Sequence, residues 1–296
     1  MRTLIIKTGA LGDVVRTTVL LNEIEGDIYW ITKKNADDLL QSDKITKKIF
    51  VENMNDVESL KDIYFDIVLS LEEDKEILKS LDKFRFGKLI GVYLDKNENF
   101  DYTPEGKEWF DMSLASIYGK DGADSLKKKN RKSHAQIFIE MLGKEFNGQE
   151  YDMGYEPKIC SGVIGIISEC KGIWPSKAWS GYETLKKLLE DEGYEVRNLG
   201  MKPTLMEHIE DINSCEVVVC GDTLGMHIAL ALKKKVVSLF NCTSPYEIYD
   251  YGRMTKIVSS LYEKFFYSKE FHEELVNSIP VKDVLEAVEK KMIEKL

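Results

Sequence analysis

Three short segments of the sequence combine glycine, charged and hydroxyl residues in ways that suit a phosphate-bearing ligand. The first is the turn TGALGD at residues 8–13, which follows a short apolar run and precedes an apolar helical stretch at residues 14–24. Glycines in such a turn let backbone N–H groups approach a ligand, and the helix start favours negative charge. Asp13 stands at that helix start, where two roles remain open: an ordinary N-cap, or a carboxylate presented at the carboxyl edge of a sheet.

The second segment, GDTLGMH at residues 221–227, follows the apolar run EVVVC. It places Asp222, Thr223, Gly225 and His227 at a strand-to-helix junction, whose unpaired N–H groups and dipole suit a phosphate. Thr223 and His227 are four residues apart, so both can face one ligand from a helix. The alternative is a purely structural use, with Asp222 or Thr223 capping the helix and His227 half-buried.

The third segment is WPSKAW at residues 174–179, which sets Lys177 between two tryptophans at another strand-to-helix junction. A lysine in this position can meet a phosphate as a point charge. The alternative is a surface lysine beside two anchoring aromatic side chains. The basic run at residues 127–132 is expected to be a solvated loop, with at most a weak attraction for an anionic acceptor.

Several common catalytic motifs are missing. The chain contains no D-x-D, H-E-x-x-H or G-x-S-x-G, and the first turn is neither G-x-G-x-x-G nor a P-loop. These absences disfavour metal-bridged diphosphate chemistry, serine-hydrolase chemistry and nicotinamide binding.

Composition narrows the class further. The chain has 296 residues, 43% of them hydrophobic, and 41 basic against 51 acidic side chains give a net charge of −10. This balance argues against a nucleic-acid binder. Five cysteines without a C-x-x-C spacing predict reduced thiols in a cytoplasmic protein, with the inner face of the membrane as an option. The opening MRTLIIK is too short for a signal peptide, and no apolar stretch approaches the roughly 20 residues of a membrane span, so any membrane contact is expected to be peripheral.

Short apolar runs alternate with stretches of helical period, which predicts βαβ units and parallel sheets. Strands are expected at residues 4–7, 28–32, 49–52, 65–71 and 89–93, then, after an irregular stretch at 94–129, a helix at 133–146 and a linker at 149–158. The alternation then restarts, with strands at 162–167, 194–199, 215–220 and 236–240 and helices at 182–192, 207–212, 226–232 and 281–295. The prediction is an α/β chain of two Rossmann-like domains, 1–150 and 151–296, facing a central cleft. Whether the last helix packs back on the first domain is left open.

Taken in order, the three segments resemble the bacterial ADP-heptose:lipopolysaccharide heptosyltransferases. The matching stretches are IIKTGALGDVVRTTVLL, WPSKAWSGYETLKKLL and CEVVVCGDTLGMHIALALKKKVVSLFNCTSPYEIYDYG. The resemblance implies a GT-B fold with an acceptor site in the first half and a nucleotide-sugar site in the second. It also implies an inverting, metal-independent transfer that uses no cofactor, and the missing D-x-D agrees with this.

The resemblance assigns roles to individual residues. Asp13 matches the catalytic carboxylate, and Lys177 matches a lysine that contacts the donor phosphates, with Lys171 as a rival because a Trp-Pro follows it too. Asp222, Thr223 and His227 match D-T-G-x-x-H, although Leu224 intrudes and the glycine stands at Gly225. Asn241 and Cys242 replace part of the usual G-P-T. Two further donor-binding candidates are Gly12 and, on the nucleoside side, Met201.

The expected function is transfer of a sugar, with heptose as one option, from a nucleotide sugar, with an ADP-linked one as an option, to a glycan or glycolipid. Asp13 would be the general base, kept ionised by its position at the helix start. Two alternatives remain: a GT-B-like nucleotide-sugar epimerase, and a non-catalytic sugar-nucleotide-binding protein. The sequence leaves open the sugar, the base, the acceptor and the oligomeric state.

Overall fold

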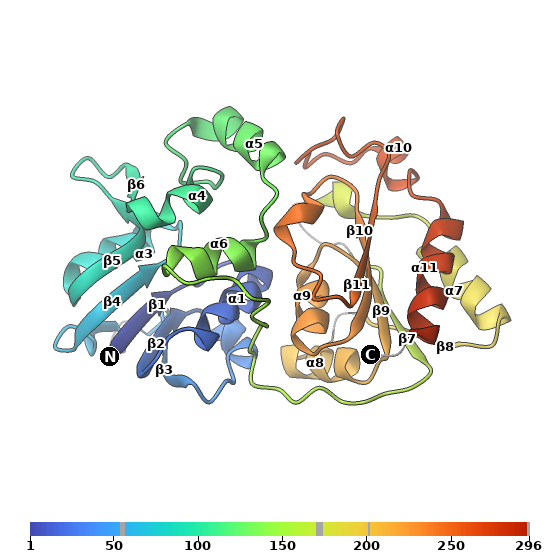
Figure 1. Cartoon of the computed structure of the whole chain (residues 1–296), viewed down its shortest axis with the longest axis horizontal. Helices are drawn as coiled ribbons and strands as arrows, with labels where there is room; N and C mark the ends of the chain where they lie inside the picture. The colour runs from blue at the N-terminus through green and yellow to red at the C-terminus, as the bar shows by residue number, and fades with distance from the viewer. Residues whose placement is uncertain (54–56, 170–173, 201, 295–296) are drawn as a thin grey trace. The chain divides into compact units, whose positions relative to one another are not determined.

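The computed structural model describes residues 1–53, 57–169, 174–200 and 202–294. Within them the chain forms two compact units, Met1–Tyr155 and Glu156–Leu296. Each unit is built around one sheet with helices packed on it (Figure 1). The Lys171 and Met201 predictions fall outside the described residues.

The sheet of unit 1 has the strand order β3-β2-β1-β4-β5-β6 in the part of the chain that the structure describes. All neighbouring pairs are parallel except β5 and β6. Its strands are β1 (Arg2–Ile6), β2 (Asp27–Thr32), β3 (Ile45–Phe50), β4 (Tyr64–Ser70), β5 (Arg85–Leu94) and β6 (Phe100–Tyr102). Residues 3–6 of β1 are all buried, as expected for a central strand of a parallel sheet.

The helices of unit 1 differ from the predicted pattern in two places. The helix expected at 14–24 begins at Leu11 and tightens into a 3₁₀ segment at Thr18. The stretch expected to be irregular contains two α-helices, and one of them includes Lys127–Lys129, so the prediction of a loop there was wrong. Lysines in the last turn of a helix are stabilised by its dipole. The α-helices are α1 (Leu11–Thr17), α3 (Lys75–Leu78), α4 (Lys107–Phe110), α5 (Gly119–Lys129) and α6 (His134–Met141).

The described sheet of unit 2 is fully parallel, with the order β11-β10-β9-β7-β8. Its strands are β7 (Val163–Ile167), β8 (Glu195–Asn198), β9 (Val217–Gly221), β10 (Lys235–Phe240) and β11 (Met254–Val258), of which β11 was not predicted. Its α-helices are α7 (Tyr182–Asp191), α8 (Leu205–Asn213), α9 (Leu224–Ala231), α10 (Glu273–Val276) and α11 (Val281–Ile293).

The core of unit 2 fixes the strands that lead to two of the candidate segments. Every residue of β7, β9 and β10 is buried, and seven of the eight residues of α9 are buried beside them. The last helix, α11, contributes Val284 and Val288 to this same core, so it packs within unit 2. The expected α/β class with mostly parallel sheets is confirmed. None of the described helices is long and apolar enough to cross a bilayer.

In each sheet, strands that follow the first one along the chain are added on both sides of it. The place where the chain changes sides is the switch point of the sheet. In unit 1 this point lies between β1 and β4, and in unit 2 it lies between β7 and β9. Open α/β sheets bind ligands at the carboxyl ends of strands flanking such a switch point. The connections after these four strands are therefore where sites are expected.

Candidate functional sites

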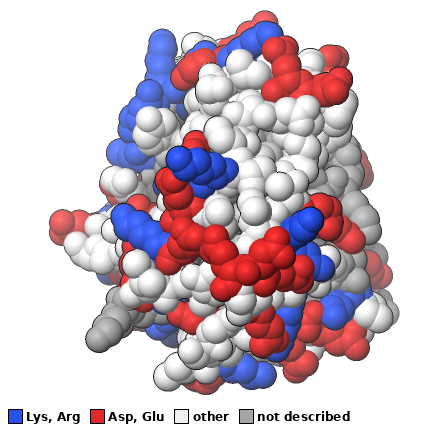
Figure 2. All heavy atoms as spheres, turned by 90° about the vertical axis from the view of Figure 1, so that its right-hand side faces the viewer, with Lys and Arg blue, Asp and Glu red and all other residues white. Residues whose placement is uncertain are grey.

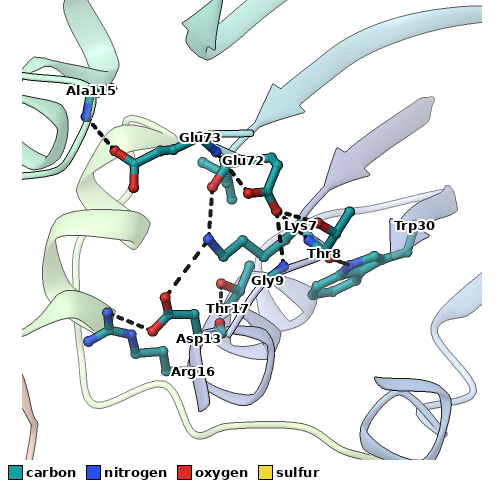
Figure 3. Close-up of polar contacts among 11 residues, drawn as sticks. Lys7, Thr8, Gly9, Asp13, Arg16, Thr17, Trp30, Glu72, Glu73 and Ala115 are labelled. Carbon is teal, nitrogen blue, oxygen red and sulfur yellow. Dashed lines mark hydrogen bonds and ion pairs between the residues drawn. The ribbon is translucent and has the colours of Figure 1, made fainter. Parts of the chain in front are cut away.

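The switch point of unit 1 holds a network of charged side chains, shown in Figure 3. Lys7, Thr8 and Gly9 follow β1, and Glu72 and Glu73 follow β4. The two connections are joined chiefly by Glu72, whose exposed fraction is only 6%.

Glu72 clamps the turn that follows β1. Its Oε2 accepts hydrogen bonds from the Thr8 backbone N–H at 2.7 Å, the Thr8 hydroxyl at 2.7 Å and the Gly9 N–H at 3.0 Å. Burial alone would raise the pKa of this carboxyl, but the charge of Lys7 and the hydrogen bonds from Thr8 outweigh burial, so the pKa lies below its ordinary value. The ionised form of Glu72 therefore fixes the geometry of the turn.

Asp13 is not the helix cap that one interpretation of the sequence allowed. The N-cap of α1 is Ala10, and no side chain caps this helix. Instead Asp13 Oδ1 pairs with Arg16 Nη2 at 2.9 Å, and Asp13 Oδ2 lies 3.9 Å from Lys7 Nζ. The Asp13 side chain keeps 34% of its surface exposed. It is thus an accessible carboxylate between two cations.

The cations beside Asp13 are themselves held in place. The Arg16 guanidinium lies over the ring of Trp109, 5.2 Å from its centroid. Lys7 Nζ donates to the Leu71 carbonyl at 3.2 Å, and the Lys7 carbonyl accepts from the Trp30 indole at 3.2 Å. Site 1, defined as Lys7, Thr8, Gly9, Asp13, Arg16 and Glu72, can therefore accept a proton at Asp13 within a fixed positive environment.

Site 2 spans the switch point of unit 2 with a single ion pair. Lys177 ends a 3₁₀ turn, Pro175–Lys177, in the connection after β7, and Asp222 directly follows β9. Lys177 Nζ donates to both Oδ2 and the backbone carbonyl of Asp222, each at 2.8 Å. Both side chains are largely buried, with 17% and 16% exposed.

The charge state of Asp222 follows from its neighbours. Burial would raise the pKa of Asp222. The charges of Lys177 and His227 and the Lys177 hydrogen bond together lower it by more, so the pKa of Asp222 lies well below the usual range. His227 belongs to the first turn of α9, and its Nε2 lies 4.0 Å from Asp222 Oδ1. The structure thus brings together the predicted residues Lys177, Asp222 and His227.

The other predicted residues of the second segment have different surroundings. Thr223 occupies the N-cap position of α9, but its hydroxyl makes no capping bond, and this buried Oγ1 has no hydrogen-bond partner among the described residues. Gly225 is buried, and a Cβ there would lie 2.3 Å from Ile167 Cδ1, so this glycine allows α9 to pack closely on β7. Gly12 lies in α1 of unit 1.

The backbone around Lys177 is held by a residue whose role the sequence did not reveal. Asn241, at the end of β10, donates from Nδ2 to the carbonyls of Ser176 at 3.3 Å and Ala178 at 2.5 Å. Cys242 Sγ donates to the Ser176 hydroxyl at 3.3 Å. Asn241 thus holds the backbone on both sides of Lys177 through these two hydrogen bonds.

Glu72 was also missed. The available signal was its position: it opens an acidic run, EED, directly after the apolar strand FDIVLSL. A charged side chain at that place is at the carboxyl edge of a parallel sheet.

Metal-ligand groups and thiols are two further features of the described residues. They contain no group of three His, Cys, Asp or Glu side chains arranged to hold a metal ion. The described cysteines are free thiols, and burial raises the pKa of Cys215 to about 11 and that of Cys220 to about 12. Such thiols stay protonated and unreactive at neutral pH.

We predict that Glu72→Gln lowers the free energy of unfolding by about 2 kcal/mol at neutral pH, because it replaces a charged group that accepts four hydrogen bonds. The folded-state pKa of Glu72 is depressed, so its contribution is complete above the unfolded pKa and is lost as the pH falls through the folded pKa. Urea denaturation should therefore show the difference from the parent shrinking as the pH falls below the range in which an ordinary glutamate titrates. Glu76→Gln is the matched control, since Glu76 is 81% exposed and pairs with Lys79 at the surface. An equal loss in both variants would contradict the clamp.

Comparison with known proteins bears on the whole chain and on one segment of it. Residues 173–276 match the family model "Glycosyltransferase family 9 (heptosyltransferase)". No curated protein sequence matches the chain significantly.

Solved structures resemble the whole chain. The E. coli heptosyltransferase WaaC with ADP-2-deoxy-2-fluoro heptose has a TM-score of 0.64 at 15% identity, covering 98% of this chain and 99% of that one. The E. coli ADP-heptose lps heptosyltransferase II has a TM-score of 0.66 at 16% identity, with 99% of each chain covered. A glycosyltransferase family 9 protein from Veillonella parvula DSM 2008 has a TM-score of 0.65 at 14% identity, covering 99% and 97%. Residues 173–276 therefore carry the pattern of glycosyltransferase family 9, and the chain as a whole has the fold of the solved GT-B heptosyltransferases.

Proposed function

We propose that this chain is an inverting, metal-independent glycosyltransferase that moves a sugar from an ADP-linked donor of the heptose type to a glycan or glycolipid acceptor. The observation that carries the proposal is the Lys177–Asp222 pair. It lies at the switch point of unit 2, within the segment that matches the family 9 model. The fold shared with a protein solved with an ADP-heptose analogue supports the choice of donor.

Donor binding is assigned to site 2, comprising Lys177, Asp222, Thr223 and His227. An ammonium group has three N–H donors, and Asp222 takes two of those on Lys177, which leaves one for a phosphate oxygen. The Thr223 hydroxyl and the N-terminus of α9 add uncharged donors. Because Asp222 is anionic, its role is to orient Lys177, and the donor phosphates contact the lysine.

The acceptor hydroxyl is assigned to Asp13. In a single displacement the hydroxyl oxygen bonds to the anomeric carbon as the bond to the diphosphate breaks, and the hydroxyl proton passes to Asp13. Lys7 and Arg16 hold the Asp13 carboxylate between two positive charges, with Arg16 at 2.9 Å and Lys7 at 3.9 Å. The leaving diphosphate receives the Lys177 contact as its charge develops.

We predict that Asp13→Asn lowers turnover about 10²-fold or more while leaving donor affinity unchanged, because a general base is lost and no donor contact is removed. Sugar transfer and ADP release should be measured with a panel of glycan and glycolipid acceptors. Asp27→Asn is the control, since Asp27 is half-exposed and pairs only loosely with Arg2 at 3.6 Å.

Unchanged turnover in Asp13→Asn would remove the catalytic role of this residue. Interconversion of the donor sugar without any acceptor would indicate an epimerase. Release of ADP without any acceptor would indicate a hydrolase. Donor binding with no turnover on any acceptor would indicate a non-catalytic sugar-nucleotide-binding protein.

We predict that Lys177→Ala weakens ADP binding about 10- to 100-fold and adenosine binding far less, because it removes a charge-assisted contact to phosphate. His227→Ala should show the same preference with a smaller loss, and the two effects should couple in a double-mutant cycle. Calorimetry with ADP and adenosine measures this. Lys202→Ala, which breaks a surface pair with Asp211, is the control.

Two further variants separate binding from stability in the same experiment. Lys177→Ala leaves the Asp222 carboxylate without its partner, whereas Lys177→Ala combined with Asp222→Ala removes both charges and should recover stability but not ADP affinity. Asn241→Ala should weaken ADP binding only while Lys177 is present, because it acts by holding that lysine. Equal losses for ADP and adenosine would assign these residues to the fold alone.

We predict that saturating EDTA leaves sugar transfer unchanged, because Lys177 and neutral N–H donors face the diphosphate and the described residues offer no metal-binding cluster. The measurement is the initial rate after chelation, with EDTA-treated and magnesium-supplemented samples compared. Loss of activity that magnesium or manganese restores would overturn the metal-independent part of the proposal.

A further inference from the structure

Unit 1 exposes large apolar side chains over one short stretch, residues 114–126. The exposed fractions are 85% for Leu114, 57% for Ile117, 52% for Tyr118 and 36% for Leu126. Tyr118 is the N-cap residue of α5, and Tyr118, Gly122 and Leu126 follow at intervals of four, so they lie along one side of that helix. Tyr118 and Leu126 therefore share one side of the helix, and Leu114 and Ile117 stand in the segment directly before it.

Helix α5 has little to hold it on its own unit. Of its eleven residues only Ala123 is buried. The helix lies at the periphery of unit 1, away from the sheet (Figure 1). A helix with so small an internal face, and with apolar side chains turned to solvent, is typical of one whose remaining surface meets a partner.

The charge beside this apolar surface is basic, in a chain whose net charge is −10. Residues 119–132 contain six Lys or Arg and two Asp. Lys120 and Lys132 pair with acidic side chains of the same unit. Lys128, Lys129 and Arg131 are exposed, and Arg131 donates to the carbonyls of Lys128 and Asn130.

Unit 2 presents the opposite charge on one of its faces. Figure 2 shows acidic side chains gathered in a band across the face viewed there. On α7 and α11, the exposed acidic residues include Glu183, Glu190, Asp191, Asp283 and Glu286. An anionic surface would be repelled by such a face and attracted by α5.

We propose that residues 114–131 form a docking surface for an anionic lipid bilayer. Leu114, Ile117 and Leu126 would enter the interface, while Lys128, Lys129 and Arg131 contact lipid phosphates. Apolar side chains beside a lysine cluster on one short helix are the combination that binds membrane interfaces, since burial and charge each add to the affinity. A nucleic acid would use the charge but would leave the aliphatic side chains in water.

The docking surface is connected to site 1 through a backbone contact. Ala115, buried between the exposed Leu114 and Ile117, donates its N–H to Glu73 Oε1 at 2.7 Å, and Glu73 is the neighbour of the clamp residue Glu72. Docking at 114–131 would thus bring Asp13, to which the acceptor hydroxyl is assigned, toward a lipid surface. The surface goes beyond the proposed function, and its binding to lipid requires no turnover.

The test is flotation of the full chain with vesicles of phosphatidylcholine alone and with about 30% phosphatidylglycerol added, at low and high salt. We expect binding only to the anionic vesicles, reduced by salt. Lys128→Ala, Lys129→Ala and Arg131→Ala combined should weaken binding about 100-fold, at about fivefold per basic residue near the surface. Leu114→Ser combined with Ile117→Ser should weaken it about tenfold or more. Lys282→Ala with Lys290→Ala, on α11 of unit 2, is the matched charge control and should bind as the parent does.

Every other outcome counts against the proposal. Equal binding by the parent and the triple variant of the basic residues would show that this surface is not the docking site. Binding that does not respond to the Leu114 and Ile117 changes would indicate only a contact with polyanions, and heparin should then compete with the vesicles. Self-association in sedimentation that Leu114→Ser abolishes would assign the surface to a second copy of the chain. Donor binding, measured on the same variants without vesicles, should be unchanged, so a failed docking test leaves the glycosyltransferase proposal standing.

Discussion

At the switch point of each sheet, the two connections that follow neighbouring strands run in opposite directions. Their backbone groups have no strand partners there, so other contacts must hold the two connections together. In both units one buried ionised side chain does so. Glu72 accepts three hydrogen bonds from the turn after β1, and Lys177 reaches both the side chain and the backbone of Asp222 after β9. The positions of Asp13 and of the N-terminus of α9 depend on these two joints.

The two joints differ in what they leave available. The Glu72 carboxylate is taken up by the turn after β1, so the accessible acidic group of site 1 is Asp13, flanked by Lys7 and Arg16. Lys177 is largely neutralised by Asp222, so site 2 has less positive charge than its sequence suggested. A phosphate there would depend on one remaining lysine N–H and on uncharged donors. In such a site the direction of the hydrogen bonds matters as much as the charge. The Lys177–Asp222 pair has to stay intact, because removing either partner would leave the other charge buried alone.

The sequence predicted the central parts of the fold better than its edges. Strands β1, β9 and β10 are buried except for Arg2 and contain short apolar runs at residues 4–6, 217–220 and 236–237, which the amino-acid pattern reveals directly. Edge strands β3 and β11 are only partly buried and carry lysines, so the first was displaced by several residues and the second was missed. Helix α5 was missed because its two glycines and many charges resemble a loop, and only its position and ion pairs reveal it.

Candidate residues could be chosen from motifs, but their partners could not. Lys177 and Asp222 are 45 residues apart, and Thr8 and Glu72 are 64 apart, so neither contact has a local signature. The departure at Asn241 shows this most clearly. From the sequence it was only a difference from the usual G-P-T, whereas in the structure its amide donates to the carbonyls on either side of Lys177, and Cys242 donates to the neighbouring Ser176. A side-chain hydrogen bond from a buried strand end can fix a loop as firmly as a rigid turn does. Asn241 therefore holds the backbone of the Lys177 loop, from which that lysine reaches Asp222.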